Sequence, residues 1–267
     1  MNLAVVRLAV PIFLAGLWLG APIAPPVLAQ NAQPASKAAS PIAPGAMEAL
    51  NKMGAYLRTL SSFQVWADVT TDNVLDDGQT IQFSSKVDLV AARPNRMRVE
   101  VTDDDGHRFF FFDGKSFTIF GQVANFYATT PAPPTLSQLA DDLNDKYGIE
   151  LPLADLFKWQ DNTAKVNKIK AAEDIGPSAV DGVTCEQYAF RQEGVDWQIW
   201  IQLGDFPLPR KLVIRTLTDD AKPQHTEILT WNLAPSFSDN AFSFDPPANA
   251  HRILIAEAQA APAKNAD

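Results

Sequence analysis

The stretch RMRVEVTDDDGHRFFFFDGKSFTIF, residues 96–120, decides the fold of this chain. Apolar and charged side chains alternate from Arg96 to Val101, which is the period of a strand with one covered face. The turn signals Asp104-Asp105-Gly106 and Asp113-Gly114 separate this strand from two more, at 108–112 and 116–120. Connections this short join antiparallel neighbours, so the stretch predicts a meander of three strands.

Strand patterns continue on both sides of this meander. Alternation predicts two strands before it, at 63–69 and 81–89, and one after it, at 125–128. Toward the C-terminus the same pattern predicts five further strands, at 165–171, 185–191, 195–203, 211–218 and 225–233. The total is about eleven strands, followed by an irregular aromatic segment from Phe237 to Pro247 that closes the domain.

Helical periodicity interrupts the strands in two places. A leading helix is predicted after Pro44-Gly45, because apolar residues recur at helical spacing at Met47, Leu50, Met53, Leu57 and Leu60. A second helix is predicted between an N-cap at Thr135 and Gly148, with one apolar face (Leu136, Leu139, Leu143, Tyr147) and one acidic face (Asp141, Asp142, Asp145). Residues 151–159 indicate a third, short helix. The predicted fold class is therefore α+β: a curved antiparallel half-barrel covered by a leading helix and a helical lid insertion.

Composition and motifs exclude several classes of function. The chain has 267 residues and a net charge of −9, so it lacks the cationic surface that nucleic acid requires. Cys185 is the only cysteine, which excludes an internal disulfide and a cysteine zinc cluster. The sequence contains no nucleophile elbow, zinc-protease motif or phosphate-binding glycine loop. We therefore expect no enzymatic activity, no cofactor and no metal site.

The N-terminal segment predicts export. Arg7 precedes an apolar run that is too short to span a bilayer, and Val27-Leu28-Ala29 fits a signal-peptidase site. We expect a signal peptide at 1–29 that is cleaved after Ala29, which places the protein in the periplasm; an uncleaved N-terminal anchor is the alternative. An Ala- and Pro-rich linker at 30–45, a folded domain at 46–255 and a disordered tail at 256–267 complete the predicted organisation.

Three short motifs resemble a known family. They are Leu57-x-x-Leu60-Ser61-Ser62-Phe63, Arg93-Pro94-Asn95 and Asp113-Gly114-Lys115-Ser116, and their order and spacing resemble the LolA-like periplasmic lipoprotein-carrier superfamily. Val180-Asp181-Gly182-Val183-x-Cys185 resembles its exported domains of unassigned function, which are the nearer match. The resemblance implies a half-barrel whose hydrophobic concave face and helical lid shield acyl chains. At Arg93 it implies a latch that donates hydrogen bonds to the lid backbone.

The inward-facing apolar residues form the candidate ligand site. The expected lining is Phe83, Val87, Met97, Val99, Phe109, Phe111, Leu139, Leu143 and Phe157. We expect a periplasmic, non-enzymatic binding protein or carrier for an apolar ligand, which is an acyl chain, a lipid or a lipidated protein. An inner- or outer-membrane protein is a further expected partner. The alternative is a structural or interaction module of an envelope complex, in which the same residues are ordinary core and fill the half-barrel.

Overall fold

The computed structural model describes residues 42–160 and 166–256. The predicted signal peptide, most of the predicted linker and nearly all of the predicted tail lie outside these residues. Within the described ranges, no helix combines the length and the hydropathy needed to cross a membrane.

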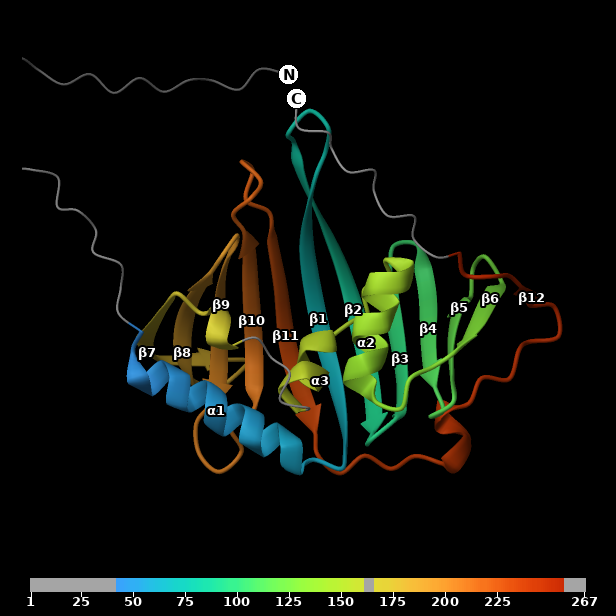
Figure 1. Ribbon diagram of the computed structural model, residues 1–267, viewed down its shortest axis with the longest axis horizontal. Helices are drawn as coiled ribbons and strands as arrows, with labels where there is room; N and C mark the ends of the chain where they lie inside the picture. Colours follow the sequence, from blue (N-terminus) through green and yellow to red (C-terminus); the bar gives the residue numbers. More distant parts are fainter. Residues whose placement is uncertain (1–41, 161–165, 257–267) are drawn as a thin grey trace, which may run out of the picture. The chain divides into compact units, whose positions relative to one another are not determined.

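One open sheet dominates the structure (Figure 1). Its strands run in the spatial order β12-β6-β5-β4-β3-β2-β1-β11-β10-β9-β8-β7, and all neighbours are antiparallel except β12 and β6. The N- and C-terminal halves of the sheet meet where β1 pairs with β11. The strands are β1 (Ser62–Val74), β2 (Thr80–Ala92), β3 (Arg96–Asp103), β4 (Gly106–Phe112), β5 (Ser116–Gly121), β6 (Phe126–Pro131), β7 (Ala171–Val180), β8 (Val183–Gln192), β9 (Val195–Gln202), β10 (Pro209–Thr216), β11 (Gln224–Asn232) and β12 (His251–Arg252).

The predicted fold class is confirmed, with one strand misplaced. Residues 166–168 form a 3-10 turn, and β7 begins at Ala171, where the predicted strand ends. The register of β7 against β8 shifts between Asp174 and Gly176, and Gly176 has a φ of 111°. This bulge interrupts the alternation along β7, so a period of two residues does not reveal the strand. The two-residue strand β12 was not predicted.

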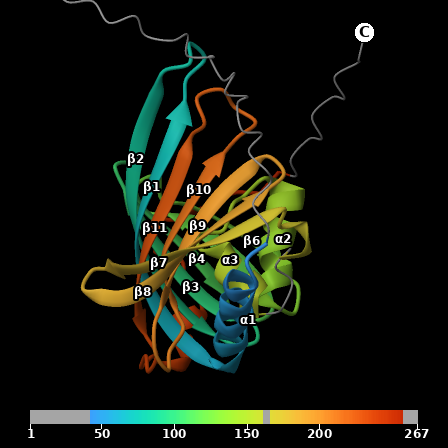
Figure 2. The same cartoon turned by 90° about the vertical axis from the view of Figure 1, so that its left-hand side faces the viewer.

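Three helices cover one face of the sheet, as the edge-on view shows (Figure 2). They are α1 (Pro44–Thr59), α2 (Leu136–Tyr147) and α3 (Ala154–Gln160). The N-cap prediction for α2 is confirmed, because the Thr135 hydroxyl accepts a hydrogen bond from the Gln138 amide. Gly148 ends α2 in the left-handed conformation, with a φ of 63°, also as predicted. Helix α1 starts at Pro44, two residues before the predicted domain start.

The covered face carries two hydrophobic cores. The first packs α2 and α3 on strands β1 to β4 and on Phe117 of β5, and the second packs α1 on β7 to β9. On the opposite face the segment after β11 runs back across the sheet. There Phe242 packs against Val90 and Ala92, and Phe244 contacts Phe111 and Phe120. The predicted aromatic closure is therefore present, and it covers part of the face that the helices leave open, at β2 and β4 to β6.

Candidate functional site

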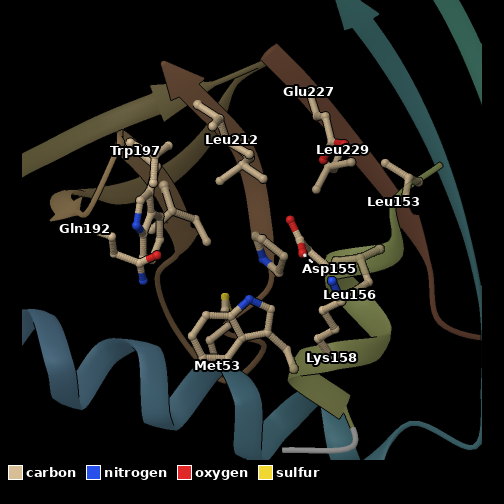
Figure 3. Close-up of a pocket in the computed structure, with 15 residues that line it drawn as sticks. Met53, Leu153, Asp155, Leu156, Lys158, Gln192, Trp197, Leu212, Glu227 and Leu229 are labelled. Carbon is tan, nitrogen blue, oxygen red and sulfur yellow. Dashed lines mark ion pairs between the residues drawn. The ribbon is translucent and has the colours of Figure 1, made fainter. Parts of the chain in front are cut away.

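Two adjoining cavities lie between the helices and the sheet. The larger, of about 1010 Å³, is bounded by α2, α3, the segment between them and strands β1 to β5, β10 and β11. The smaller, of about 320 Å³, lies between α1, α3 and strands β8 to β11 (Figure 3). Both are lined by Leu153, Asp155, Lys158, Ile214 and Glu227. We call the two cavities together the seam groove: the smaller one lies where the two hydrophobic cores meet, and the larger one adjoins it within the first core.

The strand register explains which side chains line the seam groove. Alternate residues of a strand share a face, so His225, Glu227 and Leu229 of β11 all point to the helices. Their partners on β1 are Thr71, Val69 and Ala67, and His225 pairs with Ile214 on β10. The floor of the groove thus combines apolar side chains with polar ones, and Thr71, His225 and Glu227 form a polar row on β1 and β11.

That polar row is a short hydrogen-bonded chain. The Thr71 hydroxyl lies 2.8 Å from Nδ1 of His225, and Nε2 of His225 lies 3.2 Å from Oε1 of Glu227. The hydrogen bond to Glu227 is the main cause that raises the pKa of His225, with the charges of Glu227, Glu150 and Asp155 adding to it against partial burial. The imidazole therefore takes up a proton more readily than a free histidine does.

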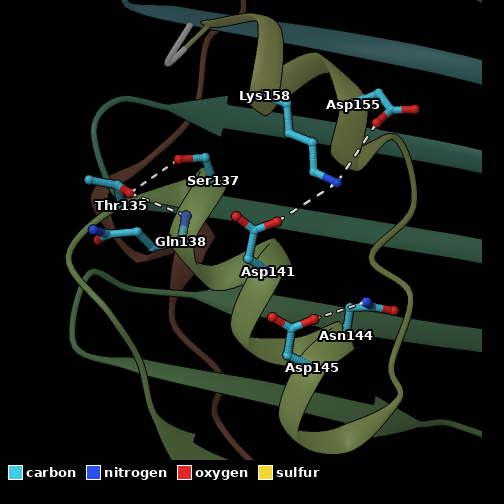
Figure 4. A network of polar contacts seen from close by, with 8 residues as sticks. All are labelled: Thr135, Ser137, Gln138, Asp141, Asn144, Asp145, Asp155 and Lys158. Carbon is cyan, nitrogen blue, oxygen red and sulfur yellow. Dashed lines mark hydrogen bonds and ion pairs between the residues drawn. The ribbon is translucent and has the colours of Figure 1, made fainter. Parts of the chain in front are cut away.

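Polar contacts also connect α2 and α3 (Figure 4). Nζ of Lys158 on α3 lies 3.8 Å from a carboxylate oxygen of Asp141 on α2 and 4.0 Å from one of Asp155. Asp141 and Asp155 are exposed and Lys158 is partly exposed, so these ion pairs contribute little to the free energy of folding. They orient Lys158 and Asp155 at the wall of the seam groove.

Six of the predicted lining residues lie in the first core, but only one of them reaches the groove. Val87 lines the larger cavity. The other five are buried among neighbouring side chains, beneath α2 and α3: Met97, Val99, Leu139, Leu143 and Phe157. This part of the concave face is filled by the protein itself.

The predicted inward orientation of Phe109 and Phe111 is wrong. Val99 pairs with Phe110 and Met97 pairs with Phe112, so Phe110 and Phe112 face the helices. Phe109 and Phe111 stack on each other on the opposite face, and Phe111 also contacts Phe244. A run of four phenylalanines is apolar on both faces, so alternation within the run does not determine which pair points inward.

Phe83 has the predicted face but not the predicted burial. It belongs to the same face of β2 as Ser85 and Val87, which line the larger cavity. Its side chain is 48% exposed and lines neither cavity, although its partner on β1, Thr71, lines the larger one. Phe83 is therefore not part of the groove.

The predicted latch residue contacts the leading helix. Nη1 of Arg93 donates a hydrogen bond of 3.0 Å to the carbonyl oxygen of Arg58, in the last turn of α1. The next residue contacts the backbone of α2, since the Pro94 carbonyl accepts a hydrogen bond from the amide of Leu136. The Arg93-Pro94 turn thus connects the end of α1 to the start of α2.

The remaining groove residues were missed by the sequence analysis. They include Trp197, Leu212 and Ile214, which occupy alternate positions of strands that were predicted. The signal that could have found them is this alternation, applied to β9, β10 and β11 as it was to the earlier strands. To use this signal, one must know that helices also cover the half of the sheet that contains β9, β10 and β11.

Comparison with solved structures finds several chains of similar arrangement at low sequence identity. An uncharacterised conserved protein from Thermus thermophilus is 13% identical, with a TM-score of 0.45, and the match covers 79% of this chain and 99% of that one. Lipoprotein LppX from Mycobacterium tuberculosis is 11% identical, with a TM-score of 0.47 and coverage of 73% and 99%. A LolA superfamily protein from Nitrosomonas europaea is 11% identical, with a TM-score of 0.31 and coverage of 74% and 97%.

The family model gives the decisive comparison. No curated protein sequence matches the chain. The model described as a predicted periplasmic protein of the DUF2092 family matches residues 46–256, which is most of the chain. The resemblance to exported domains of unassigned function is thereby confirmed at the level of the family. This chain belongs to the DUF2092 family of predicted periplasmic proteins.

Proposed function

We propose that this protein binds an apolar chain in the seam groove and carries it, without chemical change, in the periplasm. The observation that supports the proposal is the groove itself. The larger cavity, of about 1010 Å³, reaches the upper limit of the range typical of small-molecule sites, and the adjoining one adds about 320 Å³. The walls of the smaller cavity are mainly apolar, and the larger cavity combines apolar and polar side chains. The apolar parts suit an acyl chain, a lipid or the acyl part of a lipidated protein.

Burial of the chain supplies the affinity. Each methylene taken out of water stabilises the complex by about 0.8 kcal/mol before the cost of ordering the chain is subtracted. The smaller cavity offers Trp197, Leu212 and Leu229 as apolar contacts on the sheet side. On the helix side Met53 and Leu156 complete the enclosure. Such a site needs few polar anchors to retain a long chain.

The proposed function requires that the protein is exported to the periplasm. The family is described as periplasmic, and cleavage after Ala29 stays a prediction from the sequence. The protein recovered from the periplasm is expected to begin at Gln30. N-terminal sequencing checks this, and Met1 on a membrane-bound form would favour the uncleaved anchor.

A second function is supported by a different observation. Met97, Val99, Leu139, Leu143 and Phe157 fill the part of the half-barrel beneath α2 and α3. A structural or interaction module of an envelope complex would need no ligand, and such packing suits it. The two functions differ in whether the seam groove is occupied.

Lipid extraction and a probe titration together separate the two functions. Protein purified from the periplasm is analysed by native mass spectrometry for bound lipid, and the delipidated protein is titrated with the uncharged fluorophore N-phenyl-1-naphthylamine. Ile214→Trp fills the junction of the two cavities and is expected to weaken probe binding by about tenfold or more. Arg215→Trp, on the exposed opposite face of β10, is the matched control and should bind normally. No copurified lipid and equal binding by both variants would favour the structural module.

A further inference from the structure

The larger cavity of the seam groove opens at one end of its strands. Along β2 the side chains that face the helices change from buried at Val87, which is 3% exposed, to partly exposed at Ser85. On β4 the same change runs from the buried Phe110 to Arg108, whose side chain is 53% exposed. All four residues line the larger cavity. The cavity therefore opens where β2 and β4 approach the β1–β2 and β3–β4 turns.

The helix side of the cavity is exposed at the same end. Helix α2 begins at Leu136, whose amide donates a hydrogen bond to the Pro94 carbonyl, in the turn at the opposite end of β2 and β3. Its C-terminal end thus lies toward the opening (Figure 1). Asn144, Gly148 and Glu150, at the end of α2 and just after it, line the larger cavity and are exposed. They form the rim that faces the strand ends.

The β1–β2 hairpin continues past this opening. The pairing of β2 with β3 ends at Lys86 and Thr102, whereas its pairing with β1 continues to the end of both strands (Figure 1). Phe83 lies on this overhang, two residues beyond Ser85 and therefore on the same, helix-facing side of β2. It is 48% exposed. A large apolar side chain thus lies directly outside the opening.

Entry at this end requires no helix to leave the sheet. Lifting α2 instead would expose Leu139 and Leu143, which belong to the first core. An apolar chain that enters at the strand ends first meets water and the ion pair of Arg108 with Asp103, and apolar surface in water is unfavourable. Contact with Phe83 covers part of that surface before the cavity walls enclose it.

A contact made only in transit changes rates and not affinity. Entry and exit pass through the same transition state, so a side chain that stabilises this state raises both rate constants by the same factor. The dissociation constant, which is the ratio of the two, stays unchanged. Because Phe83 lines neither cavity, the bound ligand does not depend on it.

We propose that the apolar ligand enters and leaves the seam groove through the open end of the larger cavity, and that Phe83 contacts its chain in transit. This inference rests on the proposed function and adds an entry route to it. It assigns a role to an exposed apolar side chain that does not contribute to either core.

Stopped-flow fluorescence tests the entry route. The delipidated protein is mixed with N-phenyl-1-naphthylamine, and the association and dissociation rate constants are measured separately. Phe83→Ser is expected to lower both by about threefold to tenfold, with a dissociation constant within about twofold of the wild type. Phe83→Leu keeps an apolar contact and should restore most of both rates. Phe126→Ser is the matched control, because Phe126 is 44% exposed and lines neither cavity, and its rate constants should equal those of the wild type.

The outcomes separate the entry route from the proposed function. Unchanged rate constants in Phe83→Ser, with the wild type binding the probe, would overturn the entry route and leave the proposed function intact. Weaker affinity caused by faster dissociation alone would also overturn it, because Phe83 would then contact the bound ligand. Equal slowing by Phe126→Ser would do the same. Failure of the wild type to bind the probe would overturn the proposed function, and this inference with it.

Discussion

Helix α2 is expected to be a fixed part of the core, and Leu143→Ala tests this. Leu143 is 1% exposed and belongs to the first core, and it does not line either cavity of the seam groove. Truncating such a leucine removes its transfer free energy and leaves a void that cannot merge with an existing cavity. We expect the free energy of unfolding to fall by about 3 to 4 kcal/mol.

The burial of its leucines also determines how easily α2 can leave the sheet while the rest of the domain stays folded. Lifting it from the sheet would expose Leu136, Leu139 and Leu143, each of which contributes about 1.5–3 kcal/mol by burial. The sum is roughly 5–9 kcal/mol, comparable to the total stability of a typical domain. We therefore expect α2 not to open as a routine gate, in contrast to the helical lid expected from the sequence.

Urea unfolding, monitored by tryptophan fluorescence, measures the change in the free energy of unfolding. Hydrogen exchange of the α2 amides measures the free energy that opening this helix costs. Asp145→Ala is the matched control, because it changes an exposed side chain on the outer face of the same helix. Its free energy of unfolding should differ by less than about 0.5 kcal/mol. If Leu143→Ala lowers the free energy of unfolding by less than about 1 kcal/mol, the reasoning is refuted. The same holds if the α2 amides exchange through an opening that costs less than about 3 kcal/mol, and either result would favour a lid at α2.

Three further predictions concern residues outside that helix. Arg93→Leu removes the hydrogen bond to the Arg58 carbonyl and should lower the free energy of unfolding by about 1 kcal/mol, with Arg93→Lys intermediate; no change in urea unfolding would mean that the contact does not hold α1 in solution. His225 has a raised pKa, so its stabilisation is complete below the ordinary value of 6.5 and is lost as pH rises through the folded value. The melting temperature of the wild type should therefore exceed that of His225→Gln by more at about pH 5.5 than at about pH 9, and the reverse order would contradict the assigned partners. Cys185 is fully buried and burial raises its pKa, so it should react slowly with a thiol reagent in the native protein and fast in urea, whereas equal rates would show it to be accessible.

Sequence reasoning succeeded where the determinant is local. The limits of α2 follow from the Thr135 hydroxyl and from the freedom of Gly148 to adopt a positive φ, and both act within one turn of helix. The meander of residues 96–120 follows equally from short turns and strict alternation. Such signals need no knowledge of the rest of the chain.

It failed where the determinant is a partner distant in sequence. The inward pair of the phenylalanine run is selected by the register against Met97 and Val99, which no property of the run itself encodes. The start of β7 is concealed by the bulge at Gly176. The partner of Arg93 depends on where α1 ends in space, and the sequence offers only a basic residue in a turn.

The seam groove could not be predicted from any single segment, because helices and strands that are distant in sequence line it together. Helix α1 covers one half of the sheet, α2 and α3 cover the other, and β10 and β11 run between them. A curved sheet with helices at both ends leaves apolar side chains such as Ile214 and Leu212 without complete cover at this boundary. A ligand that binds the groove binds the folded chain and not the unfolded one. It therefore stabilises the folded state by mass action, by about 2.7 kcal/mol at a free concentration of one hundred times its dissociation constant. Occupancy of the groove should therefore raise the melting temperature of the whole domain, and not only that of the helices that cover it.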